Sequence, residues 1–265
     1  MNNKYKRMGL SLFGDKAKSF FYLSKKIINY PINLQRKICK NISWKFKANK
    51  LIDKIGYLQL HLGCGDRHFG GMLNCEYRAT RAADIVMDCG NLQKFKNNSI
   101  RLIFSHAFIE HLYRKQQQPF LNECHRVLEE GGILIFLGIP DFQVIVQNYI
   151  NQSSVMIGTN NIFNLYHVYR YTHGDPEIAP GYWQEQLHKS LFDKEYLKRI
   201  LKKANFSNSF FFNYAYPGEV IELNLGVITW KDKKPNSQII MDHMRNFKEY
   251  IGDFQKFESD FISKN

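Results

Sequence analysis

Short apolar runs alternate with polar stretches between residues 57 and 230, and most have the length and composition of buried β-strands. They span 57–62, 83–87, 99–104 and 132–137. A helical pattern of apolar residues over 120–128 precedes the last of these runs. Strands that alternate with helical segments indicate a parallel sheet with crossover connections. The pattern therefore predicts an α/β domain.

Two later apolar runs, 206–216 and 223–230, flank Pro217-Gly218, a dipeptide that marks a turn. A turn between two strands predicts an antiparallel pair, which we expect to close the sheet.

Two helices are predicted beside these strands from their starting residues. Asp141 follows Pro140 and precedes an apolar run to residue 150, and Asp193 precedes a helical pattern to residue 204. Aspartate is a favoured N-cap because its carboxylate accepts hydrogen bonds from free backbone N–H groups of the first turn. We expect both aspartates to cap their helices.

The first apolar run ends in the glycine loop Gly63-Cys64-Gly65. Glycine adopts positive φ without strain and lets a ligand approach the backbone. The link from this loop to Asn74 is short, which predicts that the first crossover helix is reduced to a turn. It also argues against a nicotinamide dinucleotide enzyme, in which G-x-G-x-x-G opens a full helix.

Polar residues and glycines gather where the predicted strands end. In a parallel sheet the ligand-binding groups lie at the carboxyl ends of the strands. The residues in such positions are Gly63, Gly65, Glu76, Asp88, Ser105 and His106.

Five segments in this order and spacing resemble class I S-adenosylmethionine-dependent methyltransferases, most closely the small bacterial type found with surface-glycan synthesis. The segments are Leu62 to Gly65, Asn74 to Glu76, Ala83 to Asp88, Ser105 to Leu112, and Arg126 to Gly132. The resemblance covers roughly residues 57 to 230. Two positions depart from the family: Glu76 replaces the usual Asp, and Arg67 stands where many members have a third glycine.

The resemblance implies a Rossmann-like fold with a mostly parallel seven-stranded sheet, an antiparallel last strand and S-adenosyl-L-methionine as the cofactor. It places the glycine loop beside the methionine part of the cofactor, Glu76 on the ribose, Asp88 at the adenine, and Ser105 with His106 near the methyl group. The full set of cofactor-binding residues that we expect is Gly63, Cys64, Gly65, Glu76, Asp88, Cys89, Ser105 and His106.

The expected reaction is O-methylation of a small molecule, sugar or lipid-linked glycan, with a histidine as general base. Histidine suits this role because it titrates near neutral pH. The candidates are His111, His188 and His106, with His173 as a further one. The motifs of adenine- and cytosine-modifying enzymes are absent, so an RNA methyltransferase is the less favoured alternative. The second alternative is a non-catalytic binding protein with a degenerate cofactor pocket.

The positive charge is concentrated at the N-terminal end. Residues 1–54 contain 14 Lys and Arg against two acidic residues, within a whole-chain net charge of +13. Apolar residues recur there at helical spacing, and Pro31 is expected to separate two helices or to start the second. A basic amphipathic helix over 16–50 favours binding to an anionic membrane surface. A helix packed on the core and a nucleic-acid contact remain alternatives.

Three units are expected along the chain: a basic helical extension over 1–54, a methyltransferase domain over 55–232, and a helical segment over 233–265. Residues 151–190 combine an irregular pattern with many aromatic residues. Long irregular segments in compact domains are often functional, so we interpret this one as a substrate-covering insertion.

Five cysteines without a C-x-x-C pair fit a reducing compartment and indicate neither a disulfide framework nor a zinc site. Cys64 is expected to pack and not to act as a nucleophile. No metal-ligand spacing stands out, so no metal is expected. No apolar run approaches 18 residues, and no secretory signal is recognised. The expected location is the cytoplasm, with peripheral association at the inner face of the membrane; the oligomeric state is left open.

Overall fold

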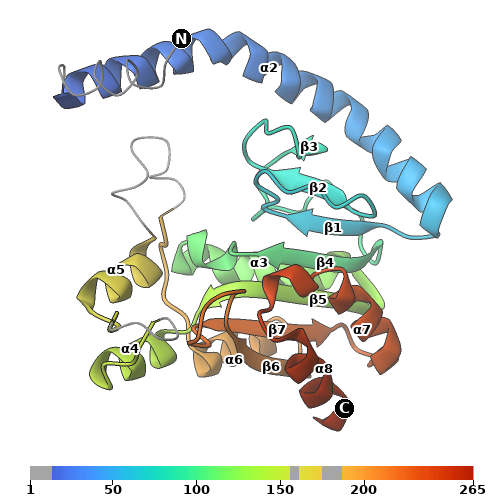
Figure 1. Cartoon of the computed structure of the whole chain (residues 1–265). Coiled ribbons are helices and arrows are strands. Elements are labelled where there is room, and N and C mark those ends of the chain that lie inside the picture. The colour runs from blue at the N-terminus through green and yellow to red at the C-terminus, as the bar shows by residue number, and fades with distance from the viewer. Residues whose placement is uncertain (1–13, 156–160, 175–186, 265) are drawn as a thin grey trace.

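The computed structural model describes the backbone of residues 14–155, 161–174 and 187–264, and side chains from residue 34 onwards. At its centre is one seven-stranded sheet with the order β3-β2-β1-β4-β5-β7-β6 (Figure 1). The strands are β1 (Gln59–Leu62), β2 (Leu73–Glu76), β3 (Ile85–Val86), β4 (Ile100–His106), β5 (Leu128–Pro140), β6 (Ser209–Tyr214) and β7 (Asn224–Trp230).

The strand directions confirm the predicted Rossmann-like fold. The pairs among β1 to β5 are all parallel, whereas β7 runs antiparallel to both β5 and β6. Every strand that was expected from an apolar run is present. The carboxyl ends of β1, β2 and β4 consequently lie at one edge of the sheet, where the glycine loop begins.

Helical segments cover both faces of the sheet. They are α2 (Gly14–Ile55), η1 (Ile109–His111), α3 (Arg114–Val127), α4 (Phe142–Ile150), α5 (Leu165–His173), α6 (Lys194–Lys203), α7 (Ser237–Arg245), η3 (Lys248–Tyr250) and α8 (Phe254–Lys264). One core cluster joins the sheet to α3, α6 and the end of α2, and a second joins it to α7, η3 and α8. The stripes of α3 and α6 that supply this core include Phe120 and Leu197, both fully buried.

The predicted loss of the first crossover helix is confirmed, because no helix lies between β1 and β2 in the described residues. The C-terminal segment packs against that part of the sheet instead. The rings of Phe104 on β4 and Phe247 stack with centroids 3.6 Å apart and an angle of 4° between planes. Phe69, from the short link, packs edge-on against both rings. Stacked and edge-on aromatic pairs of this kind add to the stability gained by burial.

Residues Gly14–Ile55 form one helix, α2, so the expectation that Pro31 separates two helices or starts the second is wrong. Helices tolerate an internal proline at the cost of one backbone hydrogen bond and often bend there. The helix passes over the β3–β2–β1 side of the sheet and extends beyond it (Figure 1).

The C-terminal half of α2 is fastened to the sheet by polar contacts. Lys47 Nζ donates to Asp84 Oδ1 at 2.8 Å, and Lys40 Nζ donates to the carbonyl of Ala83. Trp44 packs edge-on against Phe95 at 5.8 Å between centroids, and Ala48 is buried. This part of the extension is therefore packed on the domain.

The opposite side of α2 carries an exposed apolar stripe. Leu34, Ile38, Ile42 and Phe46 recur every four residues and are 49%, 51%, 76% and 74% exposed. A row at i, i+4, i+8 lies along one side of a helix. The helix therefore turns apolar residues to solvent on the side away from the sheet.

The two predicted N-caps are confirmed. Asp141 accepts a hydrogen bond from Gln143 N at 3.1 Å, and Asp193 accepts one from Tyr196 N at 2.6 Å. Between these helices, α5 and residues 187–190 belong to the expected insertion, and the rest of its aromatic stretch, within 175–186, lies outside the described residues.

All five cysteines are free thiols. No helix in the part of the chain that the structure describes is long and apolar enough to span a membrane.

Candidate functional site

A pocket of about 530 Å³ opens at the carboxyl edge of the sheet. Its walls come from β1 and the glycine loop, from His106 at the end of β4, from residues 216–217 after β6, and from residues 249–250 of η3. The volume lies within the range of about 300–1,000 Å³ that is typical of small-molecule sites. Segments almost 190 residues apart in the sequence thus form one cavity.

The glycine loop adopts a left-handed backbone conformation at two positions, and this conformation favours glycine. Gly63 and Gly65 have φ of +67° and +53°, which side-chain-bearing residues rarely adopt. A Cβ on Gly63 would lie 2.8 Å from Cδ2 of Phe108, whereas a Cβ on Gly65 would meet no atom within 4 Å. Gly63 therefore allows close packing of the loop on η1, and Gly65 leaves free space beside its backbone.

Glu76, at the end of β2, is almost fully buried and holds the glycine loop. Its Oε2 accepts a hydrogen bond of 2.9 Å from Gly65 N, and its Oε1 accepts bonds of 3.2 Å from the backbone and side chain of Arg78. A carboxylate has about four acceptor positions. Glu76 can therefore accept further hydrogen bonds from a ligand beside Gly65.

Asp88 and Cys89 follow β3 but do not line the pocket. The exposed Asp88 carboxylate accepts a 2.9 Å bond from Gly90 N and so shapes its own turn. The thiol of Cys89 lies beside the backbone N–H of Gly63, and burial raises its pKa. Asp88 therefore stabilises its own turn, and Cys89 contacts the glycine loop at Gly63.

Ser105 and His106 end β4 at the same level as the glycine loop. Ser105 is buried and pairs with Leu62 in the parallel register. The ring of His106 stacks on Tyr250 with centroids 4.1 Å apart. Burial lowers the pKa of His106 to about 4, and its Nε2 has no hydrogen-bond partner among the described residues. His106 is therefore the predicted base that reaches the pocket, and it is neutral at physiological pH.

Cys64 lines the pocket but is not activated. Its side chain is 3% exposed, and burial raises its pKa to about 12. Because the thiolate is the nucleophilic form, this cysteine is suited to packing, as expected.

Several pocket residues were not among the site residues predicted from the sequence. They are His61, Asp66, Arg67, Tyr216, Pro217, Glu249 and Tyr250. Arg67, at the position of the missing third glycine, pairs with Glu249 and lies 5.2 Å from the ring centre of Tyr250. The departure from the family pattern thus coincides with a contact between the loop and η3.

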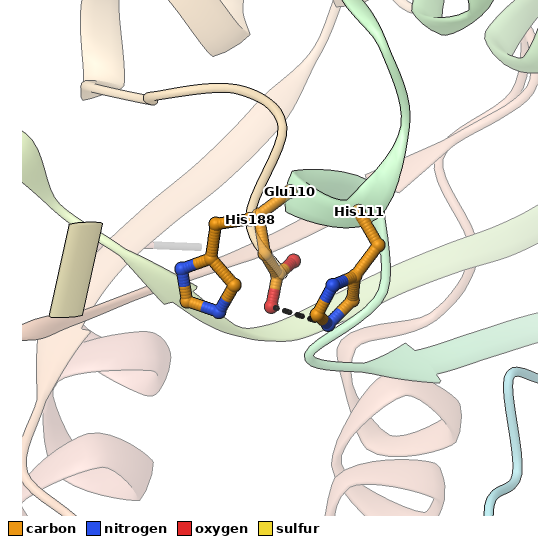
Figure 2. Close-up of side chains that lie close together, drawn as sticks. All are labelled: Glu110, His111 and His188. Atoms are coloured by element: carbon orange, nitrogen blue, oxygen red, sulfur yellow. Dashed lines mark ion pairs between the residues drawn. The ribbon is translucent and has the colours of Figure 1, made fainter. Parts of the chain in front are cut away.

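The other two predicted bases, His111 and His188, do not line this pocket but lie together beside Glu110 (Figure 2). The two imidazole rings are 5.1 Å apart between centroids, and His111 Nε2 lies 3.9 Å from Glu110 Oε1. Burial lowers the pKa of His111 to about 4 and also lowers that of His188. Burial raises the pKa of Glu110 to about 8. His173, the further candidate, accepts a backbone bond from His188 N and positions that segment.

Residues 60–136 match a protein family described as "Methyltransferase domain". The match covers the glycine loop, Glu76, Asp88, His106 and the Glu110-His111 pair. It supports the resemblance to S-adenosylmethionine-dependent methyltransferases and the expected cofactor. No curated protein has a sequence that matches this chain.

Among solved structures, the chain is similar to a SAM-dependent methyltransferase from Archaeoglobus fulgidus, with 13% identity, a TM-score of 0.44, and coverage of 71% of this chain and 95% of the other. It is also similar to a SAM-dependent methyltransferase from Thermotoga maritima, described as a possible histamine N-methyltransferase. The identity is 13% and the TM-score 0.42, and the match covers 78% of this chain and 97% of the other. A third similar structure is phosphoethanolamine N-methyltransferase 2 from Haemonchus contortus in complex with S-adenosyl-L-methionine. The identity is 13% and the TM-score 0.40, and the match covers 71% of this chain and 52% of the other. Such distant likenesses say nothing about the acceptor.

Proposed function

We propose that this protein is an S-adenosyl-L-methionine-dependent methyltransferase that binds its cofactor along the glycine loop and its acceptor in the adjoining pocket. The main observation in support of this proposal is the hydrogen bond from Gly65 N to Glu76 Oε2. It brings the glycine loop and the acid of β2 together at the carboxyl edge of the sheet, where nucleoside ligands bind in open α/β folds. The match of residues 60–136 to a methyltransferase domain supports it.

The pocket residues fit the chemistry of this cofactor. The free space beside Gly65 lies next to a carboxylate that can accept hydrogen bonds from ribose hydroxyls. Elsewhere in the pocket lining, the ring of Tyr216 suits a positively charged sulfonium, whereas Glu249 is paired with Arg67 and Tyr250 is in contact with His106 and Arg67. His106 is neutral beside that charge, because burial lowers its pKa to about 4.

The bound cofactor supplies an electrophilic methyl group that already carries its leaving group. The protein then has to orient the acceptor and, for a hydroxyl, accept its proton. We assign the proton to His106, because its ring belongs to the pocket lining and stacks on Tyr250. Its Nε2 is buried without a hydrogen-bond partner in the described residues, so the ring has to turn for this nitrogen to reach the acceptor.

The acceptor that we propose is a hydroxyl of a sugar or a lipid-linked glycan. Tyr166 and Tyr169 on α5 are 45% and 39% exposed and belong to the segment between α4 and α6. Their rings and hydroxyls are suited to a large polar acceptor. The apolar stripe of α2, with the exposed Lys37, Lys45 and Lys50 on the same helix, supports a place for the protein on an anionic membrane surface.

The first test is calorimetric titration of the full chain with S-adenosylmethionine and S-adenosylhomocysteine. We expect micromolar binding that weakens at least about tenfold in Asp88→Ala and is unchanged in Asp53→Ala, an exposed aspartate on α2. A folded wild type that binds neither compound would favour the non-catalytic alternative.

The acceptor and the base are tested by methyl transfer from labelled cofactor to lipid-linked glycans, free sugars and RNA. His106→Asn is expected to lose at least about 100-fold in kcat while it retains cofactor binding. His125→Asn, on α3, is the matched control. Labelling of RNA alone would overturn the glycan proposal, and full activity of His106→Asn would overturn the assignment of the base.

A further inference from the structure

Glu110, His111 and His188 form a compact group of potential metal ligands outside the pocket lining (Figure 2). One ligand atom from each residue lies within 4.8 Å of the other two. Glu110 and His111 are neighbours on η1, whereas His188 comes from the segment that precedes α6. The group is therefore created by tertiary structure and has no counterpart in sequence spacing.

The segment that carries His188 is fixed to η1 by its backbone. Lys189 N and Ser190 N donate to the carbonyl of Glu110 at 2.8 Å and 3.2 Å, and Ser190 Oγ donates to the carbonyl of Leu112 at 2.7 Å. These bonds hold His188 opposite His111. A site assembled on anchored backbone is preorganised, so little order has to be imposed on ligand binding.

The hydrogen bonds of the two histidines determine which nitrogen is free. Nδ1 of His188 lies 2.9 Å from the carbonyl of Tyr171, and Nδ1 of His111 lies 3.3 Å from the carbonyl of Leu187. A carbonyl only accepts, so each Nδ1 must carry the hydrogen in a neutral ring. Each Nε2 then has a free lone pair, and Figure 2 shows the two imidazole rings on either side of the Glu110 carboxylate. Metal-binding histidines in proteins are oriented in this way by a backbone carbonyl.

Glu110 supplies the observation that calls for a ligand. Its side chain is 1% exposed, and neither carboxylate oxygen has a hydrogen-bond partner among the described residues. Buried polar atoms without a partner are rare in native proteins and costly. One ligand atom from each of the three residues thus converges on a common point, and a cation there would give the Glu110 carboxylate the partner that it lacks among the described residues.

We propose that Glu110, His111 and His188 bind a divalent transition-metal ion, with zinc as the best match. Two imidazole nitrogens and one carboxylate form a ligand set of zinc sites that keep an open position, and imidazole also suits Co²⁺ and Ni²⁺. Tetrahedral zinc at about 2.1 Å from each ligand separates the ligands by about 3.4 Å. The 3.9 Å between His111 Nε2 and Glu110 Oε1 therefore has to shorten by only a fraction of an ångström.

The metal would lie beside the wall of the pocket. Glu110 lies four positions after His106, a residue of the pocket wall, on the helical turn that follows β4. Three protein ligands leave a fourth tetrahedral position for water or for an oxygen of the acceptor. Metal binding does not depend on the proposed methyl transfer and can be measured without cofactor or acceptor.

The test uses the full chain without an affinity tag, stripped with a chelator and then dialysed. Calorimetry with Zn²⁺ and the visible absorption of bound Co²⁺ report the site, and Mg²⁺ serves as the hard-cation comparison. We expect one Zn²⁺ per chain at micromolar affinity or tighter, and no response to Mg²⁺ at the same concentration. Glu110→Gln and His188→Ala should each weaken binding at least about 100-fold.

Two matched controls accompany these variants. His125→Ala and His167→Ala remove histidines elsewhere on the molecule and should bind Zn²⁺ as the wild type does. Zn²⁺ should raise the Tm of the wild type and of both controls but not that of Glu110→Gln, since a ligand that binds only the folded state stabilises it. Absence of Zn²⁺ binding to the wild type, or equal binding by wild type and Glu110→Gln, would overturn the proposal.

Discussion

The backbone N–H of Gly65 and the carboxylate of Glu76 are joined by a hydrogen bond of 2.9 Å across the ends of two neighbouring parallel strands. The acid thus positions the loop as well as offering acceptors to a ligand. Arg78 contacts the other oxygen of the same carboxylate. One side chain therefore determines the shape of the predicted ribose subsite.

Replacement of Glu76 is expected to weaken cofactor binding by a large factor. Glu76→Ala should raise the dissociation constant of S-adenosylmethionine at least about tenfold, or about 1.4 kcal/mol, because it removes both the loop contact and the ribose acceptors. Calorimetry checks this. Glu123→Gln, which changes an acid on α3 that pairs with Arg126, is the control and should bind normally. Equal affinities of Glu76→Ala and wild type would exclude the assigned ribose role.

Substitution of each loop glycine by alanine should affect the stability of the protein and its affinity for the cofactor to different extents. Gly63→Ala combines a backbone strain of about 1–2 kcal/mol with a displaced Phe108 ring, so its Tm should fall by several degrees. Gly65→Ala has the backbone strain alone, since open space surrounds its Cβ. It should keep the higher Tm of the two yet lose cofactor affinity, because the new methyl group enters the ligand space. Thermal melts and calorimetry on the pair test this, and the reverse order of Tm would contradict the structure.

Asp84 is expected to make the attachment of α2 sensitive to acid. Burial alone would raise the pKa of this carboxyl, but hydrogen bonds from Lys47 and Asn74 outweigh it and hold the pKa below its usual value. A lowered folded-state pKa contributes stability above the ordinary aspartate value of about 3.9, and this stability is lost as the pH falls through the folded-state value.

The measurement is Tm against pH for wild type and Asp84→Asn. At neutral pH the variant should be less stable by about 1–3 kcal/mol, since Lys47 loses its anionic partner. Below pH of about 4 the two curves should converge. Asp242→Asn, at an exposed ion pair with Arg245, should follow the wild type at every pH. A constant offset between wild type and Asp84→Asn would show that the carboxylate does not titrate as described.

The exposed stripe of α2 leads to a prediction about membranes. Apolar residues along one side of a basic helix insert into the headgroup region of anionic bilayers. Ile42→Asp combined with Phe46→Asp should abolish sedimentation with phosphatidylserine-containing vesicles, whereas Ile262→Asp, at an exposed position of α8, should not. Both variants should fold, because the changed residues face solvent. Binding of the double variant to the vesicles would contradict the prediction, and a change in oligomeric state instead would assign the stripe to a second copy of the chain.

The sheet and the glycine loop could be predicted because their signals are local. Apolar runs that precede Gly63 and His106 define strands and their carboxyl ends, and parallel pairing then brings those ends together. The contribution of Tyr250 could not be predicted in this way, because η3 reaches the pocket through tertiary contacts such as the packing of Phe247 on Phe104. His188 meets His111 for a similar reason, because Lys189 N and Ser190 N donate to the carbonyl of Glu110 from a distant part of the sequence.

The orientation of α2 illustrates a different limit. The spacing of Leu34, Ile38 and Ile42 predicts an amphipathic helix, yet these residues face solvent. The side that contacts the sheet combines the packing of Trp44 on Phe95 with the bond from Lys47 to the buried carboxylate of Asp84. Helical periodicity identifies a stripe but does not say what the stripe faces.

The pocket wall built by η3 has a consequence for synthesis of the protein. Residues 57–140 contain the strands and the loop of the cofactor half, but the face of that half is covered by α7, η3 and α8, whose apolar residues belong to the same core cluster. Phe104 is synthesised 143 residues before Phe247, so during translation the earlier strands emerge from the ribosome without the aromatic residues that cover them. Domains fold as units on the nascent chain, so the cofactor half cannot close until this late segment emerges. Until the C-terminal segment has been synthesised, chaperones that recognise exposed apolar surface can bind the uncovered aromatic residues.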